Sequence, residues 1–131
     1  MLRKSPSGPL CPYYYKGGEL HPLHYGSYQD DMAALSDIID AEEAFILSSM
    51  SGRYVWIDLY ETNLTEAMTR RLAGHIAAIS PKVSKMALVG CPKKDFRRLV
   101  GYLKKSGCRL AEQISSFADP ELAKDWLVGK A

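Results

Sequence analysis

The 131-residue chain lacks any long hydrophobic run. Hydrophobic residues make up 47% of it and charged residues 24%, yet no apolar stretch approaches the roughly 20 residues that a membrane-spanning helix requires. The start, MLRKSPSGPL, has a basic pair but no following apolar core of the kind that a signal peptide needs. These absences argue against a membrane-spanning or exported protein, and we expect a cytoplasmic one.

Cysteine is scarce, and the three cysteines do not form a motif. Cys11, Cys91 and Cys108 lie far apart, and no two of them have the C-x-x-C spacing of zinc or dithiol redox sites. An odd number of widely spaced cysteines predicts reduced thiols. The sequence therefore excludes a C-x-x-C zinc or redox centre.

Histidine is equally scarce. His21 and His24 lie in HPLH, where Pro22 interrupts a regular strand or helix and no acidic residue stands at ligand spacing. Together with His75 they do not form a metal-ligand pattern. We expect no metal and no cofactor, and we expect these side chains at the surface or at a sheet edge.

The amino-terminal residues have little to bury. Residues 1–12 are rich in proline, serine and glycine, which predicts a flexible arm without a strand or helix. Residues 13–131 fit one domain, because domains cluster near about 100–150 residues. Aromatic residues interrupted by glycine and proline over residues 13–25 predict one or two short edge strands, with residues 20–25 the stronger candidate.

Helical and strand patterns then alternate along the chain. Ser27 is predicted to cap a long helix that ends near Ser49, and residues 54–61 have the β-branched and aromatic composition of a buried strand. Asn63 is predicted to cap a second helix, whose apolar stripe stops before Pro81.

The same order continues in the second half. Residues 85–90 predict a short strand, after which Cys91 at the N-cap and Pro92 in the first turn begin a third helix that closes at Gly107. A last short strand is predicted at residues 113–117. Helices between successive strands require a parallel sheet, because parallel neighbours need crossover connections, and we predict an α/β fold.

A terminal helix is predicted after Asp119, which stands before proline and glutamate. Leu122, Trp126 and Leu127 form the apolar side of this helix in the sequence pattern. We expect Trp126 to be buried against the sheet.

A cysteine and an arginine follow the strand predicted at residues 85–90. In ALVGCPKKDFRRL, Cys91 and Arg97 have the spacing that cysteine-dependent phosphatases use to bind and attack a phosphoryl group. Such loops need glycine, because several backbone N–H groups turn toward the anion. The intervening PKKDF has none, Pro92 removes an N–H donor and Asp95 adds a carboxylate. We therefore expect a helix start here and not a phosphate site.

Cys91 nevertheless supports an alternative function. A thiol at a helix N-terminus beside Lys93 is expected to have a lowered pKa. The alternative hypothesis is an enzyme or thiol switch that uses Cys91, with Asp58 or Arg97 in support.

Asp58 is a carboxylate inside an apolar strand pattern. Such a group is costly unless it is hydrogen-bonded, paired or exposed at the end of the strand. A receiver-like phosphoacceptor site would combine Asp58 with Asp30, Asp31 and Lys93, but the first acidic pair falls at a helix start and the strand pattern continues beyond Asp58. We expect Asp58 to brace a neighbouring loop.

The charges are distributed unevenly along the chain. Residues 27–66 hold nine acidic residues against Arg53 alone, whereas residues 82–109 hold nine basic residues against Asp95 alone. We expect the basic residues of the third helix on its solvent side, without the aromatic interleaving of a nucleic-acid site, and we expect no DNA partner. Acidic lipid headgroups and acidic proteins fit this face equally. The complementary charges of the acidic first helix and the basic third helix favour a weak homodimer. The basic residues are Lys93, Lys94, Arg97, Arg98, Lys104 and Lys105.

Several segments together resemble the SpoIIAA-like proteins of the STAS/SEC14 type. The segments are YVWIDLYET, NLTEA, KMALVG and SFADPELAKDWL, and the likeness runs over residues 20–128. The last segment is the most specific. Its pattern F-x-D-P-E-x-A-x-x-W-L is formed by Phe117, Asp119, Pro120, Glu121, Ala123, Trp126 and Leu127.

This resemblance implies a four- or five-stranded sheet with helices packed mainly on one face. It also implies a non-catalytic regulatory or binding module for a protein partner or a small apolar ligand. Phosphorylatable STAS members carry an Asp-Ser pair at the helix after the central strand, where this chain has Asn63 to Glu66, so Thr62 and Thr65 are the hydroxyl substitutes. The candidate binding residues near the strand ends are Asp58, Tyr60, Glu61, Thr62, Asn63, Thr65, Cys91, Lys93 and Lys94.

Overall fold

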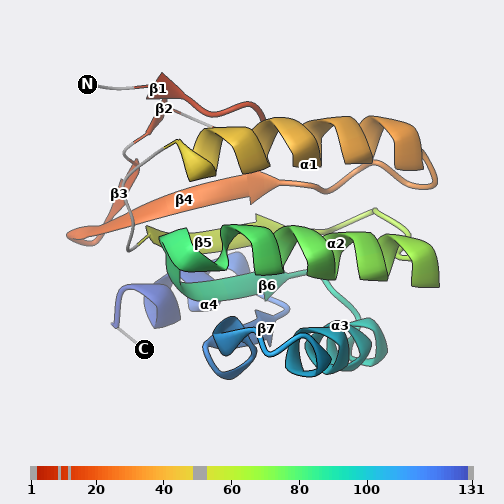
Figure 1. Ribbon diagram of the computed structural model, residues 1–131. Coiled ribbons are helices and arrows are strands. Elements are labelled where there is room, and N and C mark those ends of the chain that lie inside the picture. The colour runs from red at the N-terminus through yellow and green to blue at the C-terminus, as the bar shows by residue number, and fades with distance from the viewer. Residues whose placement is uncertain (1–2, 9, 12, 49–52, 130–131) are drawn as a thin grey trace.

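The computed structural model describes residues 3–8, 10–11, 13–48 and 53–129 and shows an α/β protein. Among these residues, five strands form one sheet in the order β3-β4-β5-β6-β7, and two further strands form a separate ribbon (Figure 1). β3 runs antiparallel to β4, and the other neighbours in the sheet are parallel. The predicted α/β class and the mostly parallel sheet are confirmed.

The elements alternate as the sequence pattern predicted. The strands are β1 (Arg3–Lys4), β2 (Leu10–Cys11), β3 (Tyr13–Tyr15), β4 (Gly18–His24), β5 (Arg53–Asp58), β6 (Val83–Val89) and β7 (Ile114–Phe117). The helices are α1 (Met32–Leu47), α2 (Glu66–Ile79), α3 (Lys93–Lys105) and α4 (Pro120–Leu127), with short 3-10 turns at Ser80–Lys82 and Arg109–Glu112.

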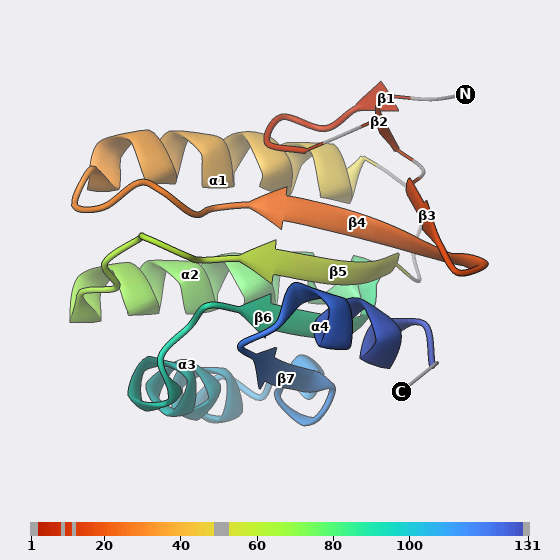
Figure 2. The ribbon, with the colours of Figure 1, turned by 180° about the vertical axis from the view of Figure 1, so that it is seen from behind.

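The strand order determines which face each helix covers. From β4 to β7, each strand lies beside the next one in the sequence, and each crossover contains a helix. Parallel crossovers are right-handed, so crossovers that step in one direction place their helices on one face. Accordingly α1, α2 and α3 cover one face of the sheet (Figure 1), and α4 folds back over the other (Figure 2).

The hydrophobic core is divided by the sheet. The larger cluster lies under α1, α2 and α3 and includes Leu35, Ile57, Leu72 and Leu99. The smaller cluster lies under α4. Its fully buried members are Leu20, Ala87, Val89, Ala123 and Leu127.

β4 carries a proline at a position that tolerates it. The N–H of His24 donates to Ser7 Oγ outside the sheet, whereas the N–H of Tyr25 donates inward to the carbonyl of Asp58. Backbone N–H groups alternate in direction along a strand, so position 22 shares the outward direction of His24. Pro22 therefore lacks only a donor that would not have paired with β5.

The first crossover helix begins later than predicted. Ser27 and Gln29 have φ values of 66° and 46°, so the chain turns through left-handed conformations where the helix start was expected. The N-cap is Asp31, whose side chain accepts from the N–H of Ala34 at 3.1 Å. The prediction that Ser27 caps this helix is wrong, and its predicted end near Ser49 lies outside the described residues.

The caps of the next two helices also differ from the prediction. The cap of α2 is Thr65, which accepts from the N–H of Met68 at 3.1 Å, and not Asn63. The cap of α3 is Pro92, and not Cys91, and no side chain hydrogen-bonds at that cap. In both helices the observed N-cap lies one or two residues after the predicted one.

The amino-terminal segment contains strands. β1 pairs antiparallel with β2, and Ser5, in the loop between them, is 0% exposed. The expectation that residues 1–12 contain no strand is therefore wrong. Serine and lysine side chains order this segment by hydrogen bonds to backbone groups and to a carboxylate. The low apolar content of the segment does not predict such bonds. Residues 1, 2, 9 and 12 of the predicted arm lie outside the described residues.

α4 buries a narrower side than its sequence suggested. Leu127 is 1% exposed, but Leu122 is 57% exposed, so its predicted place on the apolar side is wrong. Trp126 is half-buried, with its ring 5.6 Å from that of Phe117 and 4.3 Å from the ammonium of Lys85. The helix therefore rests on Ala123 and Leu127.

We predict different stability losses for the two leucines of α4. Leu127→Ala should lower the free energy of unfolding by about 2–5 kcal/mol, because it removes a fully buried side chain. Leu122→Ala, the matched control on the same helix, should change it by no more than about 0.5 kcal/mol. Urea unfolding followed by circular dichroism measures both values. Equal losses in the two variants would contradict the placement of α4.

Candidate functional site

The loops at the carboxyl end of the parallel strands contact one another. The loop after β4 and the loop after β5 are joined by main-chain hydrogen bonds, from Ser27 N to Tyr60 O at 2.6 Å and from Gln29 N to Glu61 O at 2.8 Å. A third bond runs back from Asn63 N to Gln29 O at 2.9 Å. We call residues 25–31 and 59–65 the carboxyl-end loops. Their mutual bonds replace the strand pairing that ends at His24 and Asp58.

These loops contain unusual backbone conformations. Ser27, Gln29 and Glu61 have φ values of 66°, 46° and 57°, a region that non-glycine residues rarely occupy. Gly26 allows the two loops to approach, because a Cβ there would lie 2.6 Å from the carbonyl oxygen of Tyr60. Conformations of this kind persist only where surrounding contacts enforce them, and they concentrate at functional sites.

Asp58 ends β5 and braces the loop after it. Its Oδ1 accepts from the N–H of Tyr60 at 2.9 Å, and its carbonyl accepts from the N–H of Tyr25 at 2.9 Å. The expectation that Asp58 braces a neighbouring loop is confirmed. The strand stops at this residue, and does not continue to Glu61 as predicted.

Tyr60 connects the loops that follow three strands. Its ring lies over Gly90, where a Cβ would stand 2.7 Å from the ring, and Gly90 has a φ of 79°. Its hydroxyl donates to the carbonyl of Ala118, after β7. The side chain is nevertheless 40% exposed. Tyr60 therefore offers an aromatic surface in a fixed orientation.

The two threonines of this region have different positions. Thr62 is buried, and its Oγ1 donates to Tyr25 O at 2.7 Å and accepts from Tyr28 N at 3.1 Å. Thr65 is exposed at the N-terminus of α2. Asn63 is exposed, and its amide donates to Asp30 Oδ1 at 2.7 Å. Thr65 is thus the accessible hydroxyl of the pair considered from the sequence.

Cys91 follows β6 and is buried. Burial raises the pKa of its thiol to about 12, and the nearby Asp95 carboxylate acts in the same direction. The predicted lowering of this pKa is therefore wrong. Lys93 and Lys94 are exposed in the first turn of α3, but desolvation of the thiol outweighs any stabilisation of a thiolate there.

We predict that Cys91 reacts slowly in the folded protein. At pH 8 its alkylation by iodoacetamide should be at least roughly a hundredfold slower than in the urea-unfolded chain, because the thiolate is the reacting species and the site is buried. Peptide mass spectrometry resolves Cys91 from Cys108, which is half-buried and serves as the internal reference. Similar rates for Cys91 in the folded and unfolded chain would contradict the assignment.

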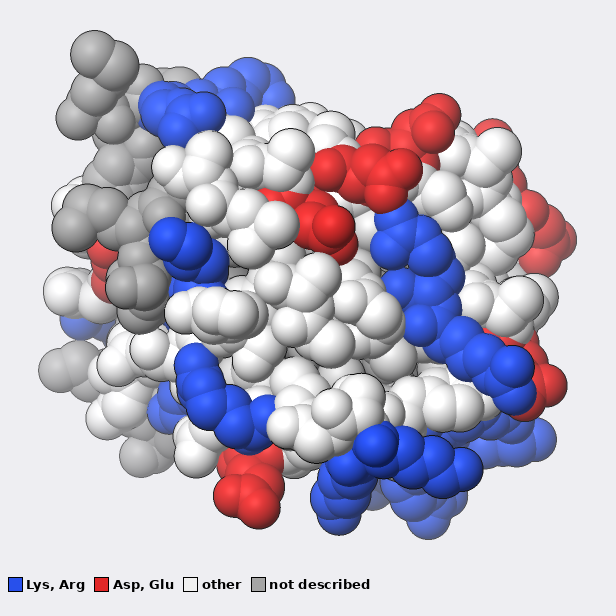
Figure 3. All heavy atoms as spheres, viewed as in Figure 1, with Lys and Arg blue, Asp and Glu red and all other residues white. Residues whose placement is uncertain are grey.

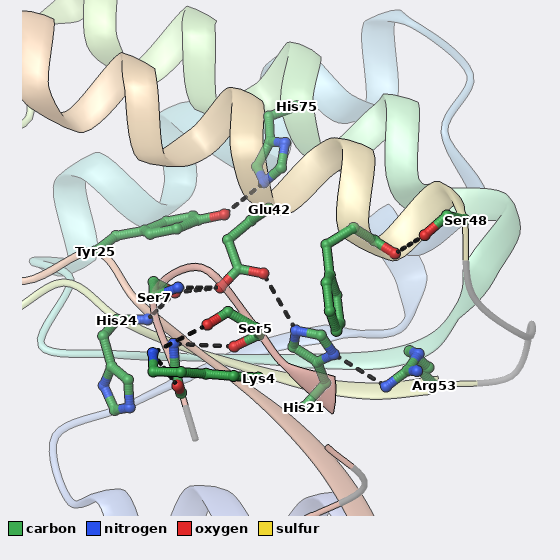
Figure 4. A network of polar contacts seen from close by, with 12 residues as sticks. Lys4, Ser5, Ser7, His21, His24, Tyr25, Glu42, Ser48, Arg53 and His75 are labelled. Atoms are coloured by element: carbon green, nitrogen blue, oxygen red, sulfur yellow. Dashed lines mark hydrogen bonds and ion pairs between the residues drawn. The ribbon is translucent and has the colours of Figure 1, made fainter. Parts of the chain in front are cut away.

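A second group of polar side chains lies beneath α1 (Figure 4). Glu42 is 0% exposed, and its carboxylate accepts from the backbone N–H of Ser7 at 2.9 Å and from the hydroxyl of Ser7. Its other oxygen is 3.4 Å from His21 Nε2. Burial acts to raise the pKa of Glu42, but the hydrogen bonds from His21 and Ser7 outweigh it, so the pKa lies below its ordinary value.

His21 connects Glu42 to β5. Its Nδ1 lies 3.0 Å from a guanidinium nitrogen of Arg53, which can only donate. Nδ1 is therefore the acceptor and Nε2 carries the proton that faces Glu42. The order guanidinium, imidazole, carboxylate connects β5, β4 and α1 through one buried ring.

His75 forms a similar chain between α1 and α2. Its Nε2 lies 2.8 Å from the hydroxyl of Tyr25, and its Nδ1 lies 3.0 Å from a carboxylate oxygen of Glu43. Burial lowers the pKa of His75, against the opposite effect of Glu43, and burial also raises the pKa of Tyr25. A neutral imidazole that donates to Glu43 and accepts from Tyr25 satisfies all three groups.

Sequence reasoning missed both of these histidine centres. His21 and His75 are 0% exposed, so the expected surface or edge position is wrong for them, while His24 is exposed as expected. One signal was available. Glu42 falls on the apolar stripe of α1 with Ile39 and Ile46, and a carboxylate at such a position must find buried partners.

The described residues contain neither a metal-ligand cluster nor a membrane-spanning helix. No group of three or more histidine, cysteine or acidic side chains within residues 3–8, 10–11, 13–48 and 53–129 could bind a metal ion. None of the helices in those ranges is both long and apolar enough to cross a bilayer.

Comparison of the chain with protein-family models, with curated proteins and with solved structures gives no match. The STAS resemblance therefore stays a prediction from the motif residues. The geometry of the carboxyl-end loops and of the histidine centres is the basis for functional inference.

We predict that His75 makes stability depend on pH between about 7 and 5. The unfolded chain has an ordinary histidine pKa of about 6.5, and the folded pKa is lower, so the unfolded state takes up protons first. The stabilisation is fully present above that value and is lost as the pH falls toward the folded pKa.

Melting temperatures at pH 7, 6 and 5 test this dependence. The wild-type melting temperature should fall with acidification, and His75→Gln should flatten the decline. His24→Gln, at an exposed histidine, is the matched control and should retain the full decline. An undiminished slope in His75→Gln would show that another group causes it.

Proposed function

We propose that the protein is a non-catalytic, STAS-like regulatory module that binds a protein partner through its carboxyl-end loops. The contact surface is formed by Tyr60, Glu61, Asn63 and Thr65, next to the first turn of α3 with Lys93 and Lys94. Asp58, Thr62 and Cys91 support this surface from beneath and do not contact the partner.

The strained backbone of these loops is the observation that carries the proposal. Left-handed conformations at Ser27, Gln29 and Glu61 are enforced by hydrogen bonds between the two loops, and the residues beside them remain exposed. A surface that is already ordered before contact loses little conformational entropy on binding. Rigid exposed aromatic side chains, of which Tyr60 is one, are typical anchors of protein interfaces.

A protein partner suits this site better than a small apolar ligand. Small-molecule sites usually enclose about 300–1,000 Å³. Three hollows along α2, α3 and the turn that follows α3 have volumes of about 230, 310 and 510 Å³. None of these three is lined by a residue of the carboxyl-end loops.

Charge is separated across the helical face next to these loops (Figure 3). α1 carries exposed Asp37 and Asp40 and no basic residue, whereas α3 carries the basic residues named from the sequence. The Asp40 carboxylate pairs with Arg71 of α2, so part of the acidic charge is satisfied within the molecule. The remaining basic charge of α3 favours a partner with an acidic surface, whose approach it accelerates.

The alternative, an enzyme or thiol switch at Cys91, has less support. Its thiol is buried and its pKa is raised, and Arg97 lies in the helix beyond Phe96, whose N–H donates to Pro92 O at 2.9 Å. This helical bond places residues 93–97 in α3, so they do not form a loop that surrounds an anion.

Site-specific photocrosslinking tests the proposed surface. A p-benzoylphenylalanine placed at Glu61 should give a discrete protein adduct in cells, and Tyr60→Ala in the same chain should reduce the yield about tenfold by removing the anchor. The same probe at Leu122, exposed on α4, is the control and should give no such adduct.

Two outcomes would contradict the proposal. Equal adducts at Glu61 and Leu122 would indicate unspecific contact. No adduct at Glu61, together with a bound non-protein mass in native mass spectrometry of the isolated chain, would replace the protein partner by a small ligand.

A further inference from the structure

The loop between β1 and β2 inserts a serine between α1 and β4. We call residues 5–8 the tip. Ser7 donates its N–H and its hydroxyl to Glu42, and its Oγ accepts from the N–H of His24 at 3.1 Å (Figure 4). One residue thus satisfies a buried carboxylate and an outward-facing donor of β4.

The tip has a compact internal structure. Ser5 Oγ accepts from the N–H of Gly8 at 2.9 Å, and Lys4 Nζ donates to the carbonyl of Gly8 at 3.2 Å. Gly8 fits closely against β4, since a Cβ there would lie 2.7 Å from the carbonyl oxygen of Pro22 and 2.8 Å from Ser5 Oγ. The requirements of the tip are therefore a hydroxyl at position 7 and no side chain at position 8.

The surface that receives the tip has the chemistry of a peptide site. We call Glu42, His24 N and Pro22 O the tip site. It offers a charged acceptor and a backbone donor at hydrogen-bond distance from Ser7, and a backbone wall against Gly8. The tip occupies these groups as a compact turn and not as an added strand, since residues 6–8 are bends and Ser5 Oγ accepts from the N–H of Gly8. Without an occupant, Glu42 would keep a buried negative charge with two donors fewer, which is unfavourable.

We propose that the tip site is a peptide-binding site that the chain's own residues 5–8 occupy, and that it accepts the same tip from a second copy. The ligand class is a short peptide with a serine followed by glycine. Reciprocal insertion of two tips gives a closed twofold dimer with the contacts of the monomer, which is the general route of segment exchange. This site is separate from the carboxyl-end loops, and its test does not depend on their function.

The first test uses the full chain with its own tip disabled. Ser7→Asp sets a second carboxylate against Glu42 and should displace the tip by like-charge repulsion. The probe is a fluorescein-labelled peptide of residues 3–8, RKSPSG. It should bind Ser7→Asp at least roughly tenfold more tightly than wild type, whose tethered tip competes at a millimolar effective concentration.

Matched peptides control for the specificity of this binding. Replacing the serine at position 7 by alanine, or the glycine at position 8 by alanine, should weaken binding to Ser7→Asp at least roughly tenfold. Equal binding of all the peptides, or no gain in a folded Ser7→Asp chain, would overturn the peptide site.

The second test asks whether another copy supplies the tip. Glu42→Gln weakens a tip site but leaves its tip intact, whereas Ser7→Asp disables a tip but leaves its tip site intact. A mixture of the two variants should sediment as a one-to-one dimer, while each variant alone stays monomeric. A mixture of folded monomers at 1 mM, a concentration on the order of the tethered tip's own effective concentration, would overturn the second-copy proposal.

Hydrogen exchange of the wild type keeps the proposal testable where a variant fails to fold. The His24 amide, bonded to Ser7 Oγ, should exchange through opening of the tip and therefore faster than the amides of β5. Excess RKSPSG peptide should leave the β5 amides unchanged. Exchange of His24 as slow as that of Val55 and Ile57 would show that the tip does not open, and would overturn the proposal.

Discussion

The buried carboxylate of Glu42 is the constraint on which the amino-terminal half of the structure depends. An unpaired charge at this depth would destabilise the fold, and Glu42 finds its partners on the amino-terminal ribbon and on β4. His21 from β4 and Ser7 from the ribbon meet at this group, and Arg53 reaches it from β5 through the imidazole. The polar amino-terminal segment is therefore ordered by one helix position, although its own sequence contains little that favours burial.

The carboxyl end of the sheet is organised by a different kind of constraint. There the strands stop pairing, and the chain must satisfy the backbone groups that the sheet no longer uses. The loops do so by bonding to one another, which forces Ser27, Gln29 and Glu61 into left-handed conformations. The strain is compensated by burial of Thr62 and by the bonds of Asp58 and Tyr60. The result is an exposed surface that is held by hydrogen bonds, and such a surface loses little conformational entropy if a partner binds it.

The parts that could be predicted from the sequence are those set by periodicity. The apolar stripe of α2, with Leu72 and Ile76, and the β-branched run of β5 predicted their elements, and their alternation predicted the parallel sheet. Helix starts were misplaced at Ser27 and Asn63, because several capping residues precede each helix and only tertiary contacts select among them. The bracing role of Asp58 followed from the cost of a carboxylate in a strand. The histidine centres did not follow, since His21 and His75 acquire acidic partners from helices distant in the sequence.

The buried histidine network and the carboxyl-end loops meet at Tyr25. Its hydroxyl contacts His75 in the buried network, its N–H donates to Asp58 O, and its carbonyl accepts from Thr62 in the carboxyl-end loops. Ser7 of the tip accepts from the N–H of His24, the residue immediately before Tyr25. The proposed occupation of the tip site and the proposed partner contact would therefore act on adjacent residues, His24 at the end of β4 and Tyr25 directly after it. Where two binding events stabilise the same conformation of that strand, each must strengthen the other by the same factor, because coupling free energies are reciprocal. β4 is thus the element that would couple the proposed tip site to the proposed partner surface.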